Sequence, residues 1–362
     1  MDAMDTVPRE ETVEVVSALG IRIELRASPD LPAPLLSRIE DAWSDCRPAR
    51  AAADEPERSI RLTGQDFDDA ERGLSDLSTR VTLEALDALR GRRLLLHAAG
   101  VAAEDGRTIA LVGPSGRGKT TASRHLGGHF SYVSDETVSV DADLSVEPYR
   151  KPLSVITDGL AHKEQIAPSA YGLKDLPTAP LRLTAITLLE RRPDAAHTGL
   201  ETVDLIDAIC EMTPQISYLP DLAQPLQYLA RVFDAIGAPT HLVYRDAVDL
   251  PELVAGMFAS PAHPNQEWAL PRRGPATSSW RATAFDDAIL VDGRACILRE
   301  GVVTALDQRG CLVWAQCLAG VSVPQIVATA IAEFGDPGAG AADDLISATL
   351  SELRDAGLLE AA

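Results

Sequence analysis

The sequence predicts an α/β protein made of three folded blocks. At the centre of the chain a strand, a glycine-rich loop and a helix follow one another, and apolar strands alternate with helical stretches on both sides. A run rich in proline then separates the last block from the rest. The chain has 362 residues, and at roughly 100–200 residues per domain this length accommodates two or three compact units.

The amino-acid composition limits the kinds of molecule that this protein is expected to bind. Asp and Glu number 54 against 33 Lys and Arg, a net charge of −21, and this balance opposes binding to nucleic acid or to an anionic membrane. The five cysteines are scattered without CxxC pairs, so we expect free thiols rather than a disulfide framework or a zinc site. The N-terminus has no signal-peptide pattern and no apolar run is long enough for a membrane span, so we expect a cytoplasmic protein.

Residues 1–90 form the first expected block, which is small and mixed α/β. Short strands are predicted within 13–26 and at 60–62, and helical stretches at 35–43 and 74–89.

Residues 91–258 form the second expected block. Its predicted elements are strands at 94–103, 108–112, 130–133 and 183–189, and helices at 121–126 and 222–236. Asp105-Gly106 between the first two strands predicts a two-residue hairpin turn. In that register paired residue numbers add up to 211, so His97 would lie opposite Pro114.

The segment after the second strand fits the phosphate-loop pattern G-x-x-x-x-G-K-[ST] in full, over Gly113, Pro114, Ser115, Gly116, Arg117, Gly118, Lys119 and Thr120. Such a loop lets backbone N–H groups converge on phosphate oxygens, and the helix that opens at Thr121 adds its positive end. Lys119 would neutralise the outer phosphates and the Thr120 hydroxyl would bind Mg²⁺. The alternative is a purely structural glycine turn.

Three groups are candidates for the chemistry beside this loop. His97 would lie at the mouth of the loop, where an imidazole can orient a phosphate or move a proton. Asp135 and Glu136 follow the strand at 130–133, and two adjacent carboxylates can divide metal binding from proton transfer. Glu190, at the end of another strand, is a second candidate for the metal. Each candidate also has a non-catalytic alternative. His97 would then simply fill a strand end, Asp135 and Glu136 would form a solvated turn, and Glu190 would be a solvated carboxylate.

Two further segments are informative. The basic run Tyr149-Arg150-Lys151-Pro152 either meets phosphate or is a solvated charge pair. Residues 259–280 contain four prolines and read as a linker that cannot supply a helix or a central strand.

The third expected block covers residues 281–362. Its predicted strands are 288–291, 295–299 and 302–306, followed by helices at 311–318, 323–334 and 342–356. Its few arginines among many acids argue against DNA binding.

The order of LLLHAAGV, a hairpin, GPSGRGKTT and YVSDETVSV resembles the nucleotide-binding core of HPr kinase/phosphorylase and its kinase-like relatives. The resemblance implies transfer of the γ-phosphoryl group of ATP to a hydroxyl, with Asp135 as proton acceptor and Lys119 and His97 stabilising and orienting the phosphate. Glu136 stands where the family usually has aspartate. Thr120 and Glu136, with Glu190 as the alternative, would hold Mg²⁺, and Gly113 to Thr121 would hold the nucleotide.

The third block resembles the PqqD-like winged-helix family, through its strand order, the ALDQRG segment and the closing LRDAGLL. That resemblance implies recognition of the leader of a ribosomally made precursor peptide, at the 302–306 strand edge and the 345–353 helix. Together the two resemblances predict an ATP-dependent kinase for Ser or Thr of such a peptide. A kinase of a regulatory protein or small molecule, and a non-catalytic scaffold switched by nucleotide, remain alternatives, and a homo-oligomer remains open.

Overall fold

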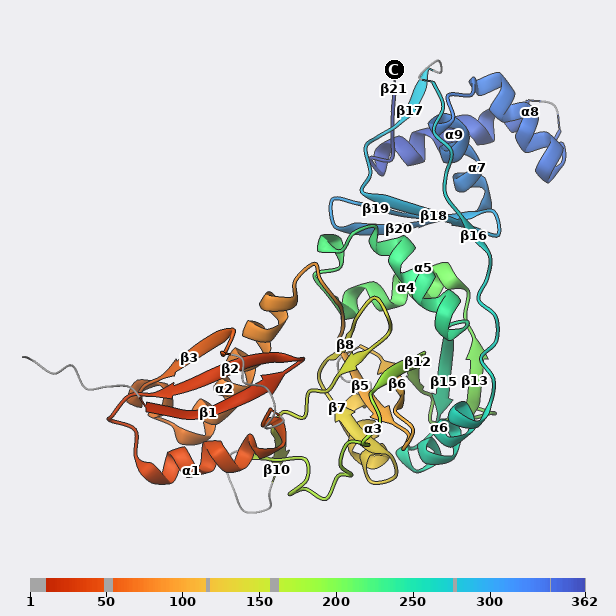
Figure 1. Ribbon diagram of the computed structural model, residues 1–362. Coiled ribbons are helices and arrows are strands. Elements are labelled where there is room, and N and C mark those ends of the chain that lie inside the picture. Colours follow the sequence, from red (N-terminus) through yellow and green to blue (C-terminus); the bar gives the residue numbers. More distant parts are fainter. Residues whose placement is uncertain are drawn as a thin grey trace, which may run out of the picture. The chain divides into compact units, whose positions relative to one another are not determined.

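A computed structural model describes residues 11–48, 55–114, 118–156, 163–275, 279–338 and 340–361 (Figure 1). Its contacts divide the chain into two compact units. Unit 1 comprises Met1–Glu201, Gln215–Tyr218 and Thr240–Pro261, and unit 2 comprises Thr202–Pro214, Leu219–Pro239 and Ala262–Ala362. Short 3-10 turns lie at Ser44–Cys46, Gly64–Phe67, Thr213–Gln215, Leu219–Asp221 and Ala247–Asp249.

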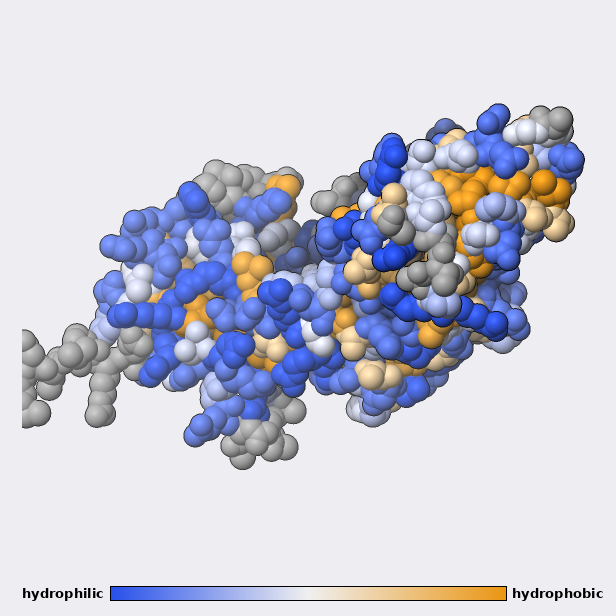
Figure 2. All heavy atoms as spheres, turned by 90° about the horizontal axis from the view of Figure 1, so that it is seen from above, coloured by the Kyte–Doolittle hydropathy of each residue, from blue (hydrophilic) through white to orange (hydrophobic). Residues whose placement is uncertain are grey.

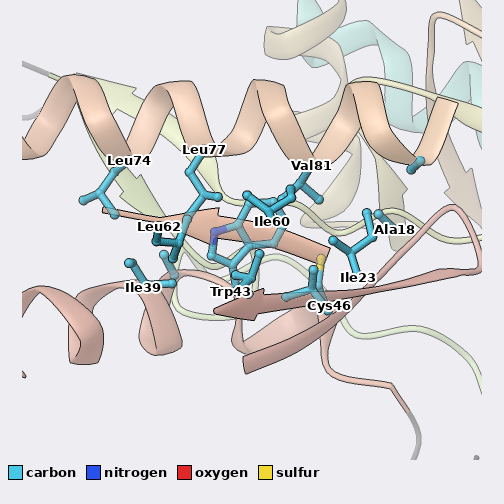
Figure 3. Close-up of a cluster of buried hydrophobic side chains, with 14 of the residues drawn as sticks. Ala18, Ile23, Ile39, Trp43, Cys46, Ile60, Leu62, Leu74, Leu77 and Val81 are labelled. Carbon is cyan, nitrogen blue, oxygen red and sulfur yellow. The ribbon is translucent and has the colours of Figure 1, made fainter. Parts of the chain in front are cut away.

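Unit 1 begins with a small lobe, called here the N-terminal lobe (residues 11–89). Its elements are β1 (Glu11–Ala18), β2 (Ile21–Ala27), α1 (Ala33–Ala42), β3 (Arg58–Leu62) and α2 (Ala70–Leu89). β2 is the central strand of the sheet, antiparallel to β1 and parallel to β3. Trp43, Leu77 and Val81 pack into its core between the helices and the sheet (Figure 3). The mixed character expected for this block is confirmed.

A six-stranded sheet forms the centre of unit 1, in the order β13-β15-β12-β6-β5-β7. Its strands are β5 (Ala98–Ala102), β6 (Arg107–Val112), β7 (Ser131–Ser134), β12 (Arg182–Arg191), β13 (Gly199–Thr202) and β15 (Thr240–Tyr244). β6, β12 and β15 are parallel, whereas β5 is antiparallel to both β6 and β7. The carboxyl ends of β6, β7, β12 and β15 therefore meet the amino end of β5 at one edge of the sheet.

Two helices cover one face of this sheet. α3 (Lys119–Gly127) packs on β5 and β7, and α6 (Leu250–Ala259) packs on α3. Ala122 and Leu126 of α3 contribute to a buried apolar cluster with Leu111 of β6 and Val254 of α6. This packing fixes the start of α3 at the carboxyl edge of the sheet, directly after the glycine-rich loop.

The hairpin between β5 and β6 differs by one position from the predicted register. Ala98 pairs with Val112, so paired numbers add up to 210 and His97 falls opposite Gly113 rather than Pro114. The reason is the turn, which has three residues rather than two. The Gly106 N–H donates to the Ala103 carbonyl, and Gly106 then has a positive φ of 86°, as in a type I turn followed by a bulge.

A second sheet, in the order β14-β4-β8-β9, lies in the same unit. It comprises β4 (Leu94–Leu96), β8 (Val138–Val140), β9 (Val146–Glu147) and β14 (Ile216–Ser217), and β10 (Leu153–Ile156) and β11 (Lys163–Ile166) form a separate pair. The single strand predicted at 94–103 is wrong in this respect, because β4 pairs with β8 in one sheet and β5 pairs with β6 in the other. His97 is the residue between them.

Unit 2 is built around a four-stranded sheet in the order β16-β18-β19-β20. Its strands are β16 (Trp268–Ala269), β18 (Asp287–Val291), β19 (Arg294–Arg299) and β20 (Val302–Leu306), and β17 (Trp280–Ala282) pairs with β21 (Leu359–Ala361). The helices are α4 (Leu205–Met212), α5 (Pro225–Ile236), α7 (Gln308–Leu318), α8 (Val323–Phe334) and α9 (Ala341–Asp355). The strands and helices predicted for the third block are confirmed to within a few residues.

Both faces of this sheet are covered. Ala295 and Ile297 of β19 belong to the core shared with α7, α8 and α9. Cys296 and Leu298, which point to the opposite face, are also buried, and α4 and α5 contact β18, β19 and β20.

The contacts therefore group α4 and α5 with residues 262–362. The sequence predicts both segments as part of the 91–258 block and a helix only for the second. The second face of the β18–β20 sheet is apolar, and α4 and α5 shield it from solvent. The proline-rich segment 259–280 contributes β16, which lies at the sheet edge, as its prolines require. None of the helices in the described part of the chain combines the length and apolar content of a membrane span.

Candidate active site at the carboxyl edge of the central sheet

The glycine-rich loop joins β6 to α3 at the carboxyl edge. Gly113 and Pro114 follow β6, Gly118 precedes α3, and Thr120 and Thr121 lie in its first turn; Ser115, Gly116 and Arg117 lie outside the described residues. Gly118 has a φ of 87°, a backbone conformation that glycine adopts without strain. The strand before the motif and the helix after it are confirmed.

Lys119 is buried within this arrangement. Its side chain is only 7% exposed, and its Nζ donates a hydrogen bond to the Gly113 carbonyl. Burial lowers the pKa of Lys119, and the charge of Glu136 acts in the opposite direction. The Lys119 side chain thus turns back toward Gly113, and its charge interacts with that of Glu136.

His97 lies at the same edge, between β4 and β5. Its backbone N–H donates to the Gln215 carbonyl at 2.7 Å, and its Nδ1 lies 4.0 Å from Glu136 Oε1. Burial, and then the charge of Lys119, lower the pKa of His97, while Glu136 raises it. The net direction is downward, because burial disfavours the charged imidazolium.

Asp135 and Glu136 occupy a tight turn after β7. The Ser134 hydroxyl oxygen accepts hydrogen bonds from the backbone N–H groups of Glu136 and Thr137, both at 3.1 Å. Oδ1 of Asp135 and the hydroxyl of nearby Tyr132 are both buried. Burial, and then the charge of Asp135 and a hydrogen bond with its side chain, raise the pKa of Tyr132. One side of the Asp135 carboxylate therefore faces the interior beside Tyr132.

Lys151 joins this cluster, although the sequence left its role open. Its Nζ lies 3.2 Å from Glu136 Oε2 and the residue is 9% exposed. Arg150, its neighbour, is buried at 4% exposure and pairs with Asp45 of the N-terminal lobe at 2.9 Å. The prediction that Arg150 and Lys151 are a solvated charge pair is therefore wrong. The sequence indicated these two residues because basic side chains are rare in this acidic chain, but it did not show that Asp45 and Glu136 are their partners.

Glu190 also lies near the carboxyl end of its strand, where its carboxylate has partners of its own. Arg192 lies 2.6 Å and His241 Nδ1 3.3 Å from Glu190 Oε2. The role of Glu190 as a metal ligand stays a prediction.

The donor set at this edge fits Mg²⁺. The described residues contain no group of three His, Cys, Asp or Glu side chains arranged around one point, but Mg²⁺ in phosphoryl-transfer sites needs only one or two protein oxygens besides the phosphates. The Thr120 hydroxyl, exposed at the start of α3, and the carboxylates of the half-buried pair Asp135 and Glu136 are oxygens of this kind.

Unit 2 carries a separate apolar cavity of about 320 Å³ between α8 and α9. Its lining includes Ala330, Phe334, Leu345, Ile346 and, at its margin, Arg309 and Asp336. Phe334 and Leu345 are 46% and 42% exposed, and Figure 2 shows apolar side chains gathered over these helices. The predicted edge strand is β20, where Val302 is 63% exposed.

Comparisons with known proteins find similarity among solved structures only. A scan of protein-family models gives no match, and a search of curated proteins gives none either. One solved structure that is similar is the HPr(Ser) kinase/phosphatase from Coxiella burnetii, over 46% of this chain and 90% of its own, with 12% identity and a TM-score of 0.27.

Proposed function

We propose that this chain is an ATP-dependent kinase that phosphorylates a Ser or Thr hydroxyl of a ribosomally made precursor peptide in the cytoplasm. The observation that carries the proposal is the convergence of a phosphate-loop lysine, a histidine and an acidic pair at one edge of the central sheet. Lys119, His97 and Glu136 are brought there from three separate elements. No structural glycine turn requires such a set.

We propose the following roles for the residues at this edge. ATP would lie with its phosphates in the loop from Gly113 to Thr121, where backbone N–H groups and Lys119 offset their charge. Asp135 would accept the proton of the attacking hydroxyl while the oxygen forms its bond to the γ-phosphorus and ADP departs with the bridging oxygen. Mg²⁺, when bound by Thr120 and a carboxylate of the acidic pair, would offset charge on the phosphates.

The peptide part of the proposal rests on unit 2. The edge of β20 and the cavity between α8 and α9 supply an open strand and an apolar groove, which are the two features that an extended peptide with apolar anchors uses. A captured leader would raise the local concentration of the acceptor at the site to roughly the millimolar range.

Mass spectrometry tests the reaction directly. The full chain, ATP, Mg²⁺ and a precursor peptide encoded beside its gene should yield a peptide heavier by one phosphate, roughly 80 Da. Phosphate on a small metabolite instead would favour a regulatory kinase, and nucleotide binding without any acceptor would favour a scaffold.

Peptide capture has its own test. Leu345→Asp introduces a charge at a partly exposed position in the groove, so we expect peptide affinity to fall by at least about tenfold, with nucleotide affinity unchanged. Leu83→Asp, on exposed α2 of the N-terminal lobe, is the matched control. Equal peptide affinity in the two variants would exclude this groove.

A further inference from the structure

The acidic pair has two different environments, although its members are adjacent in sequence. Asp135 has a buried carboxylate oxygen and interacts with the Tyr132 hydroxyl, whereas both oxygens of Glu136 lie near cationic or imidazole groups. Oε2 lies 3.2 Å from Lys151 Nζ and Oε1 lies 4.0 Å from His97 Nδ1. Glu136 is therefore the middle member of a row of three side chains.

Lys151 is held in this row by its own segment. Tyr149 is fully buried and its hydroxyl lies 2.8 Å from the Thr82 hydroxyl of α2. Arg150 pairs with Asp45 and donates to the carbonyls of Tyr132 and Lys174. With its two predecessors anchored in this way, Lys151 has little freedom to leave Glu136.

We propose, on the basis of the proposed kinase activity, that Lys151 and Glu136 are positioning residues that hold the His97 imidazole at the carboxyl edge of the sheet, and that Asp135 rather than Glu136 accepts the proton of the substrate hydroxyl. Lys151 fixes the rotamer of Glu136. The imidazole lies against Glu136 through a hydrogen bond with its backbone and through Oε1, which is 4.0 Å from Nδ1. An ion pair at 3.2 Å whose lysine is 9% exposed resists exchange with water. From the sequence, both carboxylates are candidates for catalysis and metal binding, and this assignment separates their roles.

The proposal predicts non-additive kinetics. Lys151→Met and Glu136→Gln should each lower kcat by roughly 10–100-fold, with the KM for ATP changed less than about threefold, because positioning is lost while the phosphate loop is intact. The double variant should be no worse than the more damaged single variant. Lys151→Arg should recover much of kcat, since it keeps the charge. Lys163→Met, which removes an exposed lysine of β11, is the matched control and should change nothing.

A second readout does not depend on phosphoryl transfer. The Hε1 proton resonance of His97, assigned by its absence in His97→Gln, should move in Lys151→Met and in Glu136→Gln but not in Lys163→Met. If the resonance moves while the wild-type chain transfers no phosphate, the row exists and the kinase function fails. An unmoved resonance, or additive losses of kcat in a chain that is an active kinase, would overturn the positioning role alone.

Discussion

At the scale of single residues, the site depends on side chains whose burial changes their chemistry. Lys119 is nearly buried, and in the proposed reaction it would meet a polyanion, which is favourable only if phosphate replaces the water that the lysine has lost. In the described structure the Gly113 carbonyl takes that place.

Lys119→Ala is the direct test of this residue. Removing the cation leaves the charge on the transferred group without its main protein partner, so we expect kcat/KM to fall by at least about 100-fold. Phosphate transfer measured with radiolabelled ATP checks this, with Lys163→Ala as an exposed control. Activity within threefold of wild type would remove the phosphate loop from the mechanism.

His97 predicts a pH dependence of stability. Burial and Lys119 lower its pKa in the folded chain, so below the ordinary value of about 6.5 the unfolded chain binds more protons than the folded one. The contribution of His97 is therefore complete above that pH and is lost as the pH falls toward its folded pKa. Urea unfolding at several pH values should show a weaker acid-side decline in His97→Gln, and an unchanged decline would contradict this.

The cysteines differ in reactivity for a related reason. Burial raises the pKa of Cys46 to about 12 and those of Cys311 and Cys317 to about 11. A hydrogen bond from the Cys296 thiol lowers the pKa of partly exposed Cys210. Iodoacetamide at pH 8 should therefore label Cys210 first, as peptide mapping would show, and the early label should vanish in Cys210→Ser. Early labelling of Cys311 would be the contrary result.

At the scale of elements, helix ends and strand ends decide where the site forms. α3 starts at the glycine-rich loop because Gly118 makes the turn into it. The N-terminus of α5 is capped by Asp287, which lies in a strand 60 positions later in the chain. The Asp287 carboxylate is 3% exposed and accepts hydrogen bonds from the backbone N–H groups of Leu226 and Gln227, at 2.8 and 3.0 Å. It performs the task of an N-cap from a distant segment.

Asp287→Ala should lower the free energy of unfolding by about 2–3 kcal/mol, because it leaves buried N–H groups without an acceptor. Chemical denaturation of the full chain measures this, and Glu333→Gln, at an exposed position of α8, provides the comparison. If both substitutions cost the same small amount, the cap is not important for stability.

At the scale of the whole molecule, unit 2 includes α4 and α5 as well as the C-terminal residues to which we assign peptide binding. α4 and α5 cover one face of the β18–β20 sheet, so these parts share buried surface. A chain ending at Ser279 would lack that sheet and would leave Leu226 and Phe233, which are fully buried in the complete structure, without their cover.

We therefore expect the chain truncated after Ser279 to bind the dye ANS and to unfold with reduced cooperativity. Calorimetry and dye fluorescence, with the full chain as control, measure this. A truncated chain that melts as sharply as the full chain would show that α4 and α5 do not need the sheet. Single substitutions such as Leu345→Asp are the better probe of peptide capture.

Most of the helices and strands, and the position of the glycine-rich motif, could be predicted from the sequence. Period-2 and period-3.6 patterns, glycine and proline positions, and a loop motif of fixed spacing are local properties, and local properties can be read from neighbouring residues. They located the strand before Gly113, the helix after Gly118 and the acidic turn at Asp135.

Only the tertiary structure decided which of these residues meet. The division of 94–103 between two sheets, the pairing of Lys151 with Glu136, the local use of Glu190 and the transfer of α4 and α5 to unit 2 all involve contacts between distant segments. Such contacts depend on which apolar faces cover one another and which buried charges must find a partner. That competition is settled across the whole fold, so no local pattern records its outcome.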